Sequence, residues 1–320
     1  MNCIICNNDQ NNQTFKIKEL QLGLGDEFNY QLCARCGSMQ LLDPPGDFSR
    51  YYPNEDYYSF KMEMKTLEKP GFLRTVKASY LLHGKNKFLG KLLSIGYKVP
   101  EFYHWMINTH AEFNDSILDV GCGNGSLLTR LSKMGFTHLT GIDPFINSDH
   151  DYGTIKIFKK EIYELQQKFD VIMMHHSLEH MFNPLKALQK AWSLLNEGKY
   201  LLIRIPIMGN YGWHKYKGYW CGIDAPRHIF IPSEKGMRML AERAGFMIEK
   251  TEYDSSDYVV WSSEQYLKGI PLHDPRSRMI NKKTNLFSPA EIEQFKKEIK
   301  EANEKNYGDT AAFYLKKITH

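Results

Sequence analysis

The sequence predicts an α/β protein in which helices cover a mostly parallel sheet, preceded by a small metal-binding module. Three observations lead to this prediction. From residue 115 onward, strand-like and helix-like patterns alternate along the chain. A glycine-rich turn joins the first of these strands to a helix within residues 117–128. Two C-x2-C cysteine pairs lie close to the N-terminus.

The N-terminal module is predicted from its cysteines, which are Cys3, Cys6, Cys33 and Cys36. Each pair can place two thiolates on one tight turn, and two such turns form a tetrahedral four-sulfur site suited to Zn²⁺. A redox pair is the alternative, but two pairs at this separation favour zinc. Because four protein ligands leave no open coordination position, the role expected of the ion is structural. We therefore predict a zinc ribbon over residues 1–45.

Residues 46–114 are predicted to be a tyrosine-rich segment and a helical connector. The tyrosines between 51 and 58 are Tyr51, Tyr52, Tyr57 and Tyr58. They either line a substrate pocket or cover an apolar face. Leucines and Phe88 within residues 81–93 have helical spacing, and Pro70 and Pro100 interrupt the pattern.

Regular alternation defines the rest of the chain. Strands are predicted at 116–120, 138–142, 155–158, 169–174, 199–205, 246–254 and 310–318. Helices are predicted at about 125–134, 161–166, 183–195 and 233–244. Such alternation is typical of a mostly parallel sheet covered on both faces.

The glycine-rich turn is the most informative motif. It has the form Asp-x-Gly-x-Gly-x-Gly over residues 119–125. Glycines let the backbone approach a ligand closely, because no Cβ intervenes. A dinucleotide fingerprint requires its third glycine one position later, where Ser126 stands. The turn also contains no lysine or arginine, as expected for a ligand without phosphate groups.

This turn resembles motif I of the class I S-adenosylmethionine (SAM) methyltransferases, and the Leu-Glu-His turn at 178–180 resembles another element of that family. The resemblance implies a Rossmann-like, seven-stranded, mostly parallel sheet whose last strand is antiparallel. It further implies a SAM-binding methyltransferase domain over residues 115–320, with a helical insertion at about 262–309. The residues expected to bind SAM are Asp119, Gly121, Cys122, Gly123, Gly125, Asp143, Glu161, Ile162 and His175.

Each group of these residues has an expected role. Asp119 is a partner for the cofactor ammonium, and Asp143, at the end of the second strand, can accept hydrogen bonds from both ribose hydroxyls. In the family, an acid and an apolar residue at the positions of Glu161 and Ile162 hold the adenine. His175 lies at the sheet edge where ligands bind in open α/β folds.

Candidates for chemistry follow from the need to hold a nucleophile in line with the methyl group and to remove its proton. The candidate catalytic residues are His228, His176 and Tyr58. The loop from Asp224 to His228 resembles a region of methyltransferases from cell-surface glycan and deoxysugar pathways. The related sugar C-methyltransferases have glutamate at the position of Arg227, and this difference argues against ketosugar C-methylation.

Two roles are open for this loop. Arg227 either binds a phosphate or carboxylate of the substrate or pairs with Asp224. In the second case, His228 is expected to cap the following helix instead of acting as a base.

The sequence thus predicts a SAM-dependent methyltransferase that acts on a small polar acceptor, a hydroxyl of a sugar nucleotide or glycan precursor. One alternative is an RNA or protein methyltransferase that uses the ribbon for recognition. The others are a ketosugar C-methyltransferase and a SAM-binding regulator without enzymatic activity.

Composition bears on partners and location. The chain has 41 basic and 37 acidic residues and a net charge of +4, which is too mild to indicate a nucleic-acid or membrane surface. We therefore expect no nucleic-acid partner. Apolar runs fall short of a membrane span, and six cysteines are too few for a disulfide scaffold, so a cytoplasmic location is expected.

Overall fold

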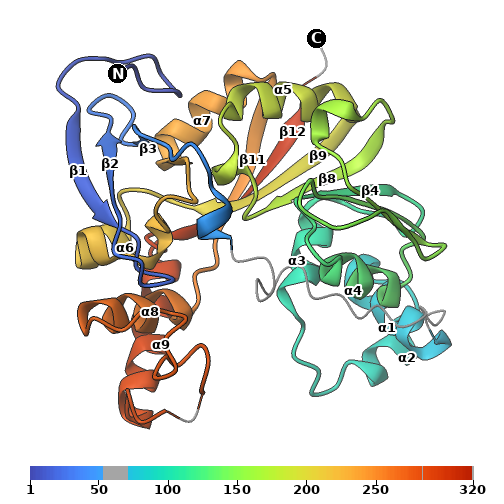
Figure 1. The fold of residues 1–320 in the computed structure, drawn as a ribbon. Helices are drawn as coiled ribbons and strands as arrows, with labels where there is room; N and C mark the ends of the chain where they lie inside the picture. Colours follow the sequence, from blue (N-terminus) through green and yellow to red (C-terminus); the bar gives the residue numbers. More distant parts are fainter. Residues whose placement is uncertain (53–70, 283, 319–320) are drawn as a thin grey trace.

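The computed structural model describes residues 1–52, 71–282 and 284–318, and its centre is an eight-stranded sheet (Figure 1). The strand order is β11-β12-β9-β8-β4-β5-β7-β6. The strands are β4 (Ser116–Val120), β5 (His138–Ile142), β6 (His150–Asp151), β7 (Ile155–Phe158), β8 (Phe169–His175), β9 (Leu195–Pro206), β11 (Phe246–Tyr253) and β12 (Thr310–Lys317).

The strand pairing has the predicted character. β7, β5, β4, β8 and β9 run parallel, and β12 is antiparallel to both β9 and β11. The prediction of a Rossmann-like, mostly parallel sheet with an antiparallel last strand is therefore confirmed. The eighth strand, β6, has only two residues, too few to produce a recognisable alternating pattern in the sequence.

Helices cover both faces of this sheet (Figure 1). One face carries α1 (Phe72–His83), α3 (Glu101–Asn108) and α4 (Ser126–Met134), and the other carries α5 (Pro184–Leu194) and α7 (Glu234–Arg243). The short α2 (Lys87–Leu93) packs on α1. Neighbouring residues of one strand supply the two cores: Ile117 belongs to the first and Leu118 to the second. This alternation follows from the two-residue period of a strand.

Capping side chains set where the helices of the second face begin. Asn183 accepts a hydrogen bond from the backbone of Lys186 at the start of α5, and Ser233 accepts one from Gly236 at the start of α7. The helix predicted at 161–166 is instead a single 3-10 turn at Ile162–Glu164. The chain returns to extended backbone at Leu165, which is buried in the core.

The N-terminal region forms a second sheet together with a distant part of the chain. Its order is β1 (Gln13–Lys18), β2 (Glu27–Leu32), β3 (Met39–Leu41) and β10 (Phe230–Ile231). β10 follows the loop from Asp224 to His228 and pairs antiparallel with β3. The loop singled out in the sequence is thereby attached to the N-terminal module.

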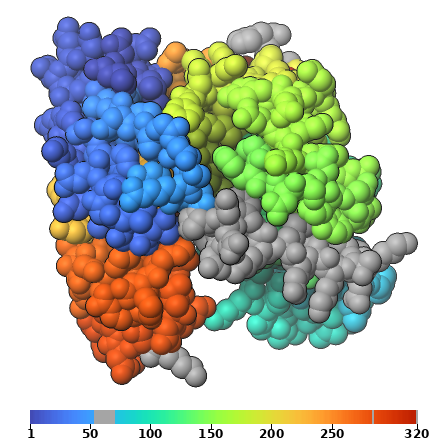
Figure 2. Space-filling model, in the orientation of Figure 1, coloured from blue at the N-terminus to red at the C-terminus, as the bar shows by residue number. Residues whose placement is uncertain are grey.

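The same module shares a hydrophobic core with the helices around β11 and β12. These helices are α6 (Tyr211–Tyr216), α8 (Asp257–Leu267) and α9 (Pro289–Glu304). Phe28 and Tyr30 of β2 belong to one buried cluster with Val260 and Phe295. Figure 2 shows the N-terminal residues, in blue, directly against the orange segment that contains α8 and α9.

Short 3-10 turns complete the described chain. They are η1 (Ser49–Tyr51), η2 (Ile162–Glu164), η3 (Leu178–His180), η4 (Lys217–Tyr219) and η5 (Cys221–Ile223). Among the helices of the described ranges, none has the length and apolar character needed to cross a membrane.

Candidate cofactor and acceptor site

A cavity of about 1120 Å³ opens at the carboxyl edge of the parallel strands. Its walls include the segments that follow β4, β5, β7 and β8, which is where ligands bind in open α/β sheets. The opposite wall comes from residues 220–228, from the start of α8 and from Tyr52. Predicted site residues that line it are Gly121, Cys122, Gly123, Asp143, Glu161, Ile162, His175, His176 and His228.

The glycine turn has the backbone geometry that makes glycine necessary. Gly121, Gly123 and Gly125 all have positive φ, at 74°, 51° and 70°. A Cβ on Gly121 would also lie 2.6 Å from Cβ of Ser177 in the next strand's turn. Gly125 begins α4 and does not line the cavity, so its requirement is conformational.

Two carboxylates lie beside this turn. Asp143 lines the cavity and accepts hydrogen bonds from the backbone of Gly123 at 3.0 Å and Phe145 at 2.9 Å. Burial raises the pKa of Asp143. Asp119 lies behind the turn rather than in the cavity wall, and burial together with the charge of Asp143 raises its pKa to about 7. A bound cation would favour the ionised form of both groups.

The other residues predicted to bind the cofactor differ in how far they are buried. Ile162 is buried in the cavity wall, whereas Glu161 is exposed and forms a reciprocal capping box with Glu164. His175 is half-buried, its ring lies 4.3 Å from that of Trp105, and neither of its ring nitrogens has a hydrogen-bond partner among the described residues. Burial places the pKa of His175 well below its usual value, so its ring is neutral.

The two candidate catalytic histidines both face the cavity. His228 donates from Nδ1 to the carbonyl of Gly222 at 2.9 Å, and burial lowers its pKa to about 4. His176 has a positive φ of 50° and contacts Arg204 through Nε2. The third candidate, Tyr58, lies outside the described residues.

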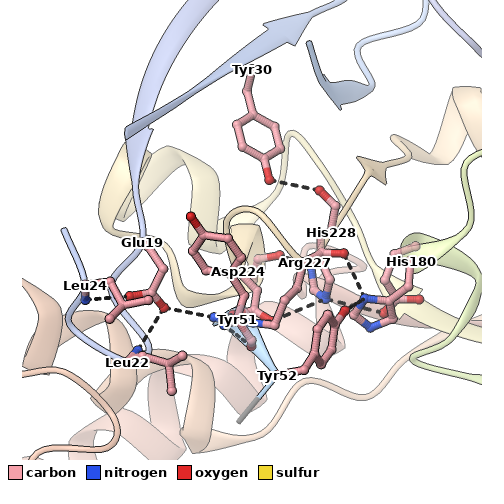
Figure 3. Close-up of polar contacts among 12 residues, drawn as sticks. Glu19, Leu22, Leu24, Tyr30, Tyr51, Tyr52, His180, Asp224, Arg227 and His228 are labelled. Atoms are coloured by element: carbon pink, nitrogen blue, oxygen red, sulfur yellow. Dashed lines mark hydrogen bonds and ion pairs between the residues drawn. The ribbon is translucent and has the colours of Figure 1, made fainter. Parts of the chain in front are cut away.

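Arg227 is held in a buried ion pair, which decides between the two roles open for it (Figure 3). Its guanidinium contacts Asp224 at 2.6 Å and Glu19 at 3.2 Å, and it donates to the carbonyl of Tyr51 at 2.9 Å. Only 1% of Arg227 is exposed, so it is unavailable to a substrate. The helix cap expected of His228 is instead supplied by Ser233.

Tyr52, one of the tyrosines for which a pocket-lining role was open, lines the cavity and reaches His180 Nδ1 through its hydroxyl at 3.2 Å. Several other cavity residues escaped the sequence prediction. Phe145 and Phe182 line the cavity while 69% and 62% exposed. Lys160 and Lys186 line it as well. Phe145 and Lys160 closely follow β5 and β7, and this position after a strand is the signal in the sequence that could have predicted them as cavity residues.

The four N-terminal cysteines meet in one buried cluster. Their sulfurs lie within 4.8 Å of one another, with Cys3 to Cys36 at 3.6 Å and Cys6 to Cys33 at 3.5 Å. These distances exclude disulfide bonds. They match the separation of roughly 3.8 Å expected between sulfurs that each lie about 2.3 Å from a tetrahedral zinc ion.

Comparison with known proteins identifies the class. Residues 81–251, more than half of the chain, match a family model described as a methyltransferase domain. The chain belongs to this methyltransferase family, and the prediction of a SAM-dependent methyltransferase is confirmed at that level.

Individual relatives are more distant. The chain is 26% identical over 178 residues to a tRNA U34 carboxymethyltransferase of Campylobacter fetus, covering 50% of this chain and 63% of that protein. It is 34% identical over 93 residues to the Campylobacter hominis protein of the same name, covering 26% and 33%. The chain thus spans less than two thirds of these relatives. A crystal structure of mycolic acid cyclopropane synthase CmaA1 with SAH and CTAB aligns with a TM-score of 0.45 and 13% identity, over 78% of this chain and 99% of that one.

These relatives correct the predicted substrate. The prediction of a sugar nucleotide or glycan precursor is wrong, because the curated proteins that match are named for a reaction on tRNA. The same names oppose the expectation of no nucleic-acid partner. The physical reason is that the glycan reading depended on the Asp224–His228 loop, whose most distinctive residue, Arg227, is buried in the protein's own ion pair.

Replacing Arg227 by methionine is expected to lower the free energy of unfolding by about 3–5 kcal/mol, because Glu19 and Asp224 would remain as buried carboxylates without their cation. Urea denaturation measures this. Adding Glu19→Gln to the variant should recover part of the loss. As a control, Arg238→Met removes an exposed pair with Glu234 and should change stability by less than about 1 kcal/mol. Equal losses in the two single variants would contradict this account.

Asp143→Asn is expected to weaken SAM binding about 10- to 100-fold, because an amide cannot accept from both Gly123 and Phe145 while it also binds the cofactor. Titration calorimetry with SAM measures the dissociation constant. Asp149→Asn is the matched control, since Asp149 is exposed, accepts a hydrogen bond from the backbone of Lys159 and does not line the cavity. An unchanged constant in Asp143→Asn would rule out a contact with the cofactor.

Proposed function

We propose that this protein is a SAM-dependent methyltransferase that acts on RNA, with tRNA as the first substrate to test. The observation that carries the proposal is the name shared by five curated relatives, tRNA U34 carboxymethyltransferase, at 26% to 34% identity. Three features of the cavity and its surroundings support it.

The first is size. The cavity of about 1120 Å³ exceeds the range of roughly 300–1,000 Å³ that is usual for a pocket holding one drug-sized ligand. SAM alone would leave part of it unfilled. The remaining space suits a second planar group, as in enzymes that draw a base out of its stack to reach it.

The second is the arrangement of aromatic rings. Phe145 stacks on Tyr52 with their centroids 6.0 Å apart, and Phe182 packs edge-on against Phe48. Both phenylalanines are mostly exposed at the cavity. Exposed rings of this kind form stacking surfaces for unpaired bases.

The third is local charge. Lys186 is exposed over the ring of Tyr163, and Lys160 is half-buried beside Phe158. Both lysines line the cavity. Two lysines next to aromatic rings can hold the phosphates on either side of a stacked base.

In this proposal the predicted residues divide between two halves of the cavity. Residues 115–320 form the catalytic domain, and Gly121, Cys122, Gly123, Asp143 and Ile162 bind SAM with the support of Asp119 and Gly125. On the acceptor side, His228 directs Nε2 into the cavity because its Nδ1 is occupied by Gly222. This nitrogen is free to take a proton or to bind a cation.

The N-terminal module over residues 1–45 has a structural role in the same proposal. Its cysteine cluster holds Zn²⁺, and its strands support the acceptor wall through β10 and through Tyr30, whose hydroxyl donates to the carbonyl of His228 at 2.9 Å. Residues 46–114 connect the module to the catalytic domain.

Transfer to RNA is tested by incubating the protein with methyl-labelled SAM and bulk tRNA. We expect label that RNase releases, and nucleoside mass spectrometry will show which base carries the group and whether it is methyl or carboxymethyl. Comparing tRNA nucleosides from cells with and without the gene tests the same point in vivo. Label in a protein fraction, or unchanged tRNA in both experiments, would overturn the proposal.

Lys186→Ala is expected to weaken tRNA binding several-fold. It should also reduce the slope of the logarithm of the binding constant against the logarithm of salt concentration by about the amount due to one phosphate contact. Filter binding at several salt concentrations measures both. Lys297→Ala, an exposed lysine of α9 paired with Glu301, is the matched control. Equal effects of the two variants would assign the loss to net charge alone.

Cys36→Ser is expected to abolish stoichiometric zinc and to lower the melting temperature by roughly 10 °C, because structural zinc contributes directly to folding. Metal analysis and thermal unfolding measure the two effects. Cys122→Ser, a thiol outside the cluster, should leave both unchanged. If the wild-type protein is incubated with zinc and holds no metal once free zinc is removed, the zinc assignment is wrong.

A further inference from the structure

We propose that Glu179, His180 and His228 form a divalent-cation site beneath the acceptor half of the cavity, separate from the cysteine cluster. One carboxylate oxygen and one nitrogen from each imidazole lie within 4.8 Å of one another. His180 and His228 line the cavity, so an ion held by the three residues would face the substrate. The role of this ion toward an RNA acceptor rests on the proposed function, whereas its binding does not.

The two imidazoles are oriented by the backbone. His180 Nδ1 donates to the carbonyl of Arg227 at 2.9 Å, and His228 Nδ1 donates to the carbonyl of Gly222 at 2.9 Å. In both rings Nε2 is therefore the nitrogen available for a ligand. A ring nitrogen fixed on a carbonyl while the other faces an ion is the usual arrangement of metal-binding histidines. Figure 3 shows the two rings close together beside Arg227.

Glu179 supplies the second, independent observation. Its side chain is fully buried, and neither carboxylate oxygen accepts a hydrogen bond from the described residues. Its backbone is fixed, because the carbonyl accepts from the amide of Ile229, next to His228. A buried carboxylate without hydrogen bonds is unfavourable unless a cation compensates for it.

Among the described residues, the ion-pair partners of this carboxylate are histidines, and no lysine or arginine pairs with it. The nearest basic group is His176, with Nδ1 at 3.3 Å from Oε1 of Glu179. Its other ring nitrogen, Nε2, contacts Arg204. Arg204 itself pairs with Asp254, and Arg227 pairs with Asp224 and Glu19.

The donor set indicates the kind of ion. Two imidazoles and one carboxylate suit Mn²⁺, Fe²⁺, Co²⁺ or Zn²⁺ and leave coordination positions open for substrate oxygen and water. An acceptor hydroxyl bound at such a position loses its proton to water more readily. Its oxygen then forms a bond to the methyl carbon as the carbon–sulfur bond breaks, leaving S-adenosylhomocysteine.

Mn²⁺ is the probe of choice, because hard oxygen and imidazole ligands hold it while the thiolate cluster favours zinc. Electron paramagnetic resonance of the full-length, zinc-loaded protein measures free Mn²⁺ during a titration. We expect one Mn²⁺ to bind per chain, and Glu179→Gln to weaken that binding at least tenfold. The control Glu234→Gln removes an exposed carboxylate on α7 and should bind Mn²⁺ as the wild type does.

Two further measurements keep the outcomes separate. SAM affinity and zinc content report whether Glu179→Gln is folded, and His228→Gln tests a second ligand if it is not. A wild-type protein that binds no stoichiometric Mn²⁺, or folded variants of Glu179 and His228 that bind it unchanged, would overturn the site. Mn²⁺ binding that depends on Glu179 in a protein inactive on RNA would confirm the site and reject the RNA acceptor.

Discussion

One buried guanidinium connects the parts of this molecule that form the cavity wall opposite the parallel strands. Arg227 contacts Glu19 of the N-terminal module, Asp224 of its own loop and the backbone of Tyr51, and almost none of it is exposed. The arrangement is stable only while all three partners are present, since a buried charge without its counter-ion is far more costly than a buried pair is favourable. The loop, the N-terminal module and Tyr51 are therefore constrained together.

This constraint determines the geometry around the neighbouring histidine. Directly after Arg227, the carbonyl of His228 accepts from Tyr30 of the N-terminal sheet, and the chain then enters β10 and pairs with β3. The carbonyl of Arg227 in turn holds His180. A ribbon that looks like a separate appendage in the sequence is thus part of the wall that orients both imidazoles.

The sequence predicted which residues after the parallel strands would line the cavity much better than it predicted the opposite wall, for a physical reason. The glycine turn, Asp143 and Ile162 directly follow strands, so their positions in the sheet follow from the order of elements. Other features depend on contacts between distant segments, and no local pattern in the sequence indicates them. These features are the ion pair of Arg227 with Glu19, the pairing of β10 with β3, and the core that β2 shares with α8 and α9. The turn Leu178–His180 was recognised, but the burial of the Glu179 carboxylate without a hydrogen bond is visible only in three dimensions.

The net charge of the chain does not decide against the proposed RNA substrate, for a related reason. A net charge of +4 describes the whole chain, whereas a bound nucleotide meets only the groups around the cavity. There the acids are engaged with the protein: Asp143 with backbone amides and Asp224 with Arg227. Lys186 remains exposed beside stacking rings. Screened charges act over about 10 Å, so the few groups at the opening outweigh the balance of the remote surface. A mildly charged protein can therefore present lysines beside aromatic rings to an RNA base.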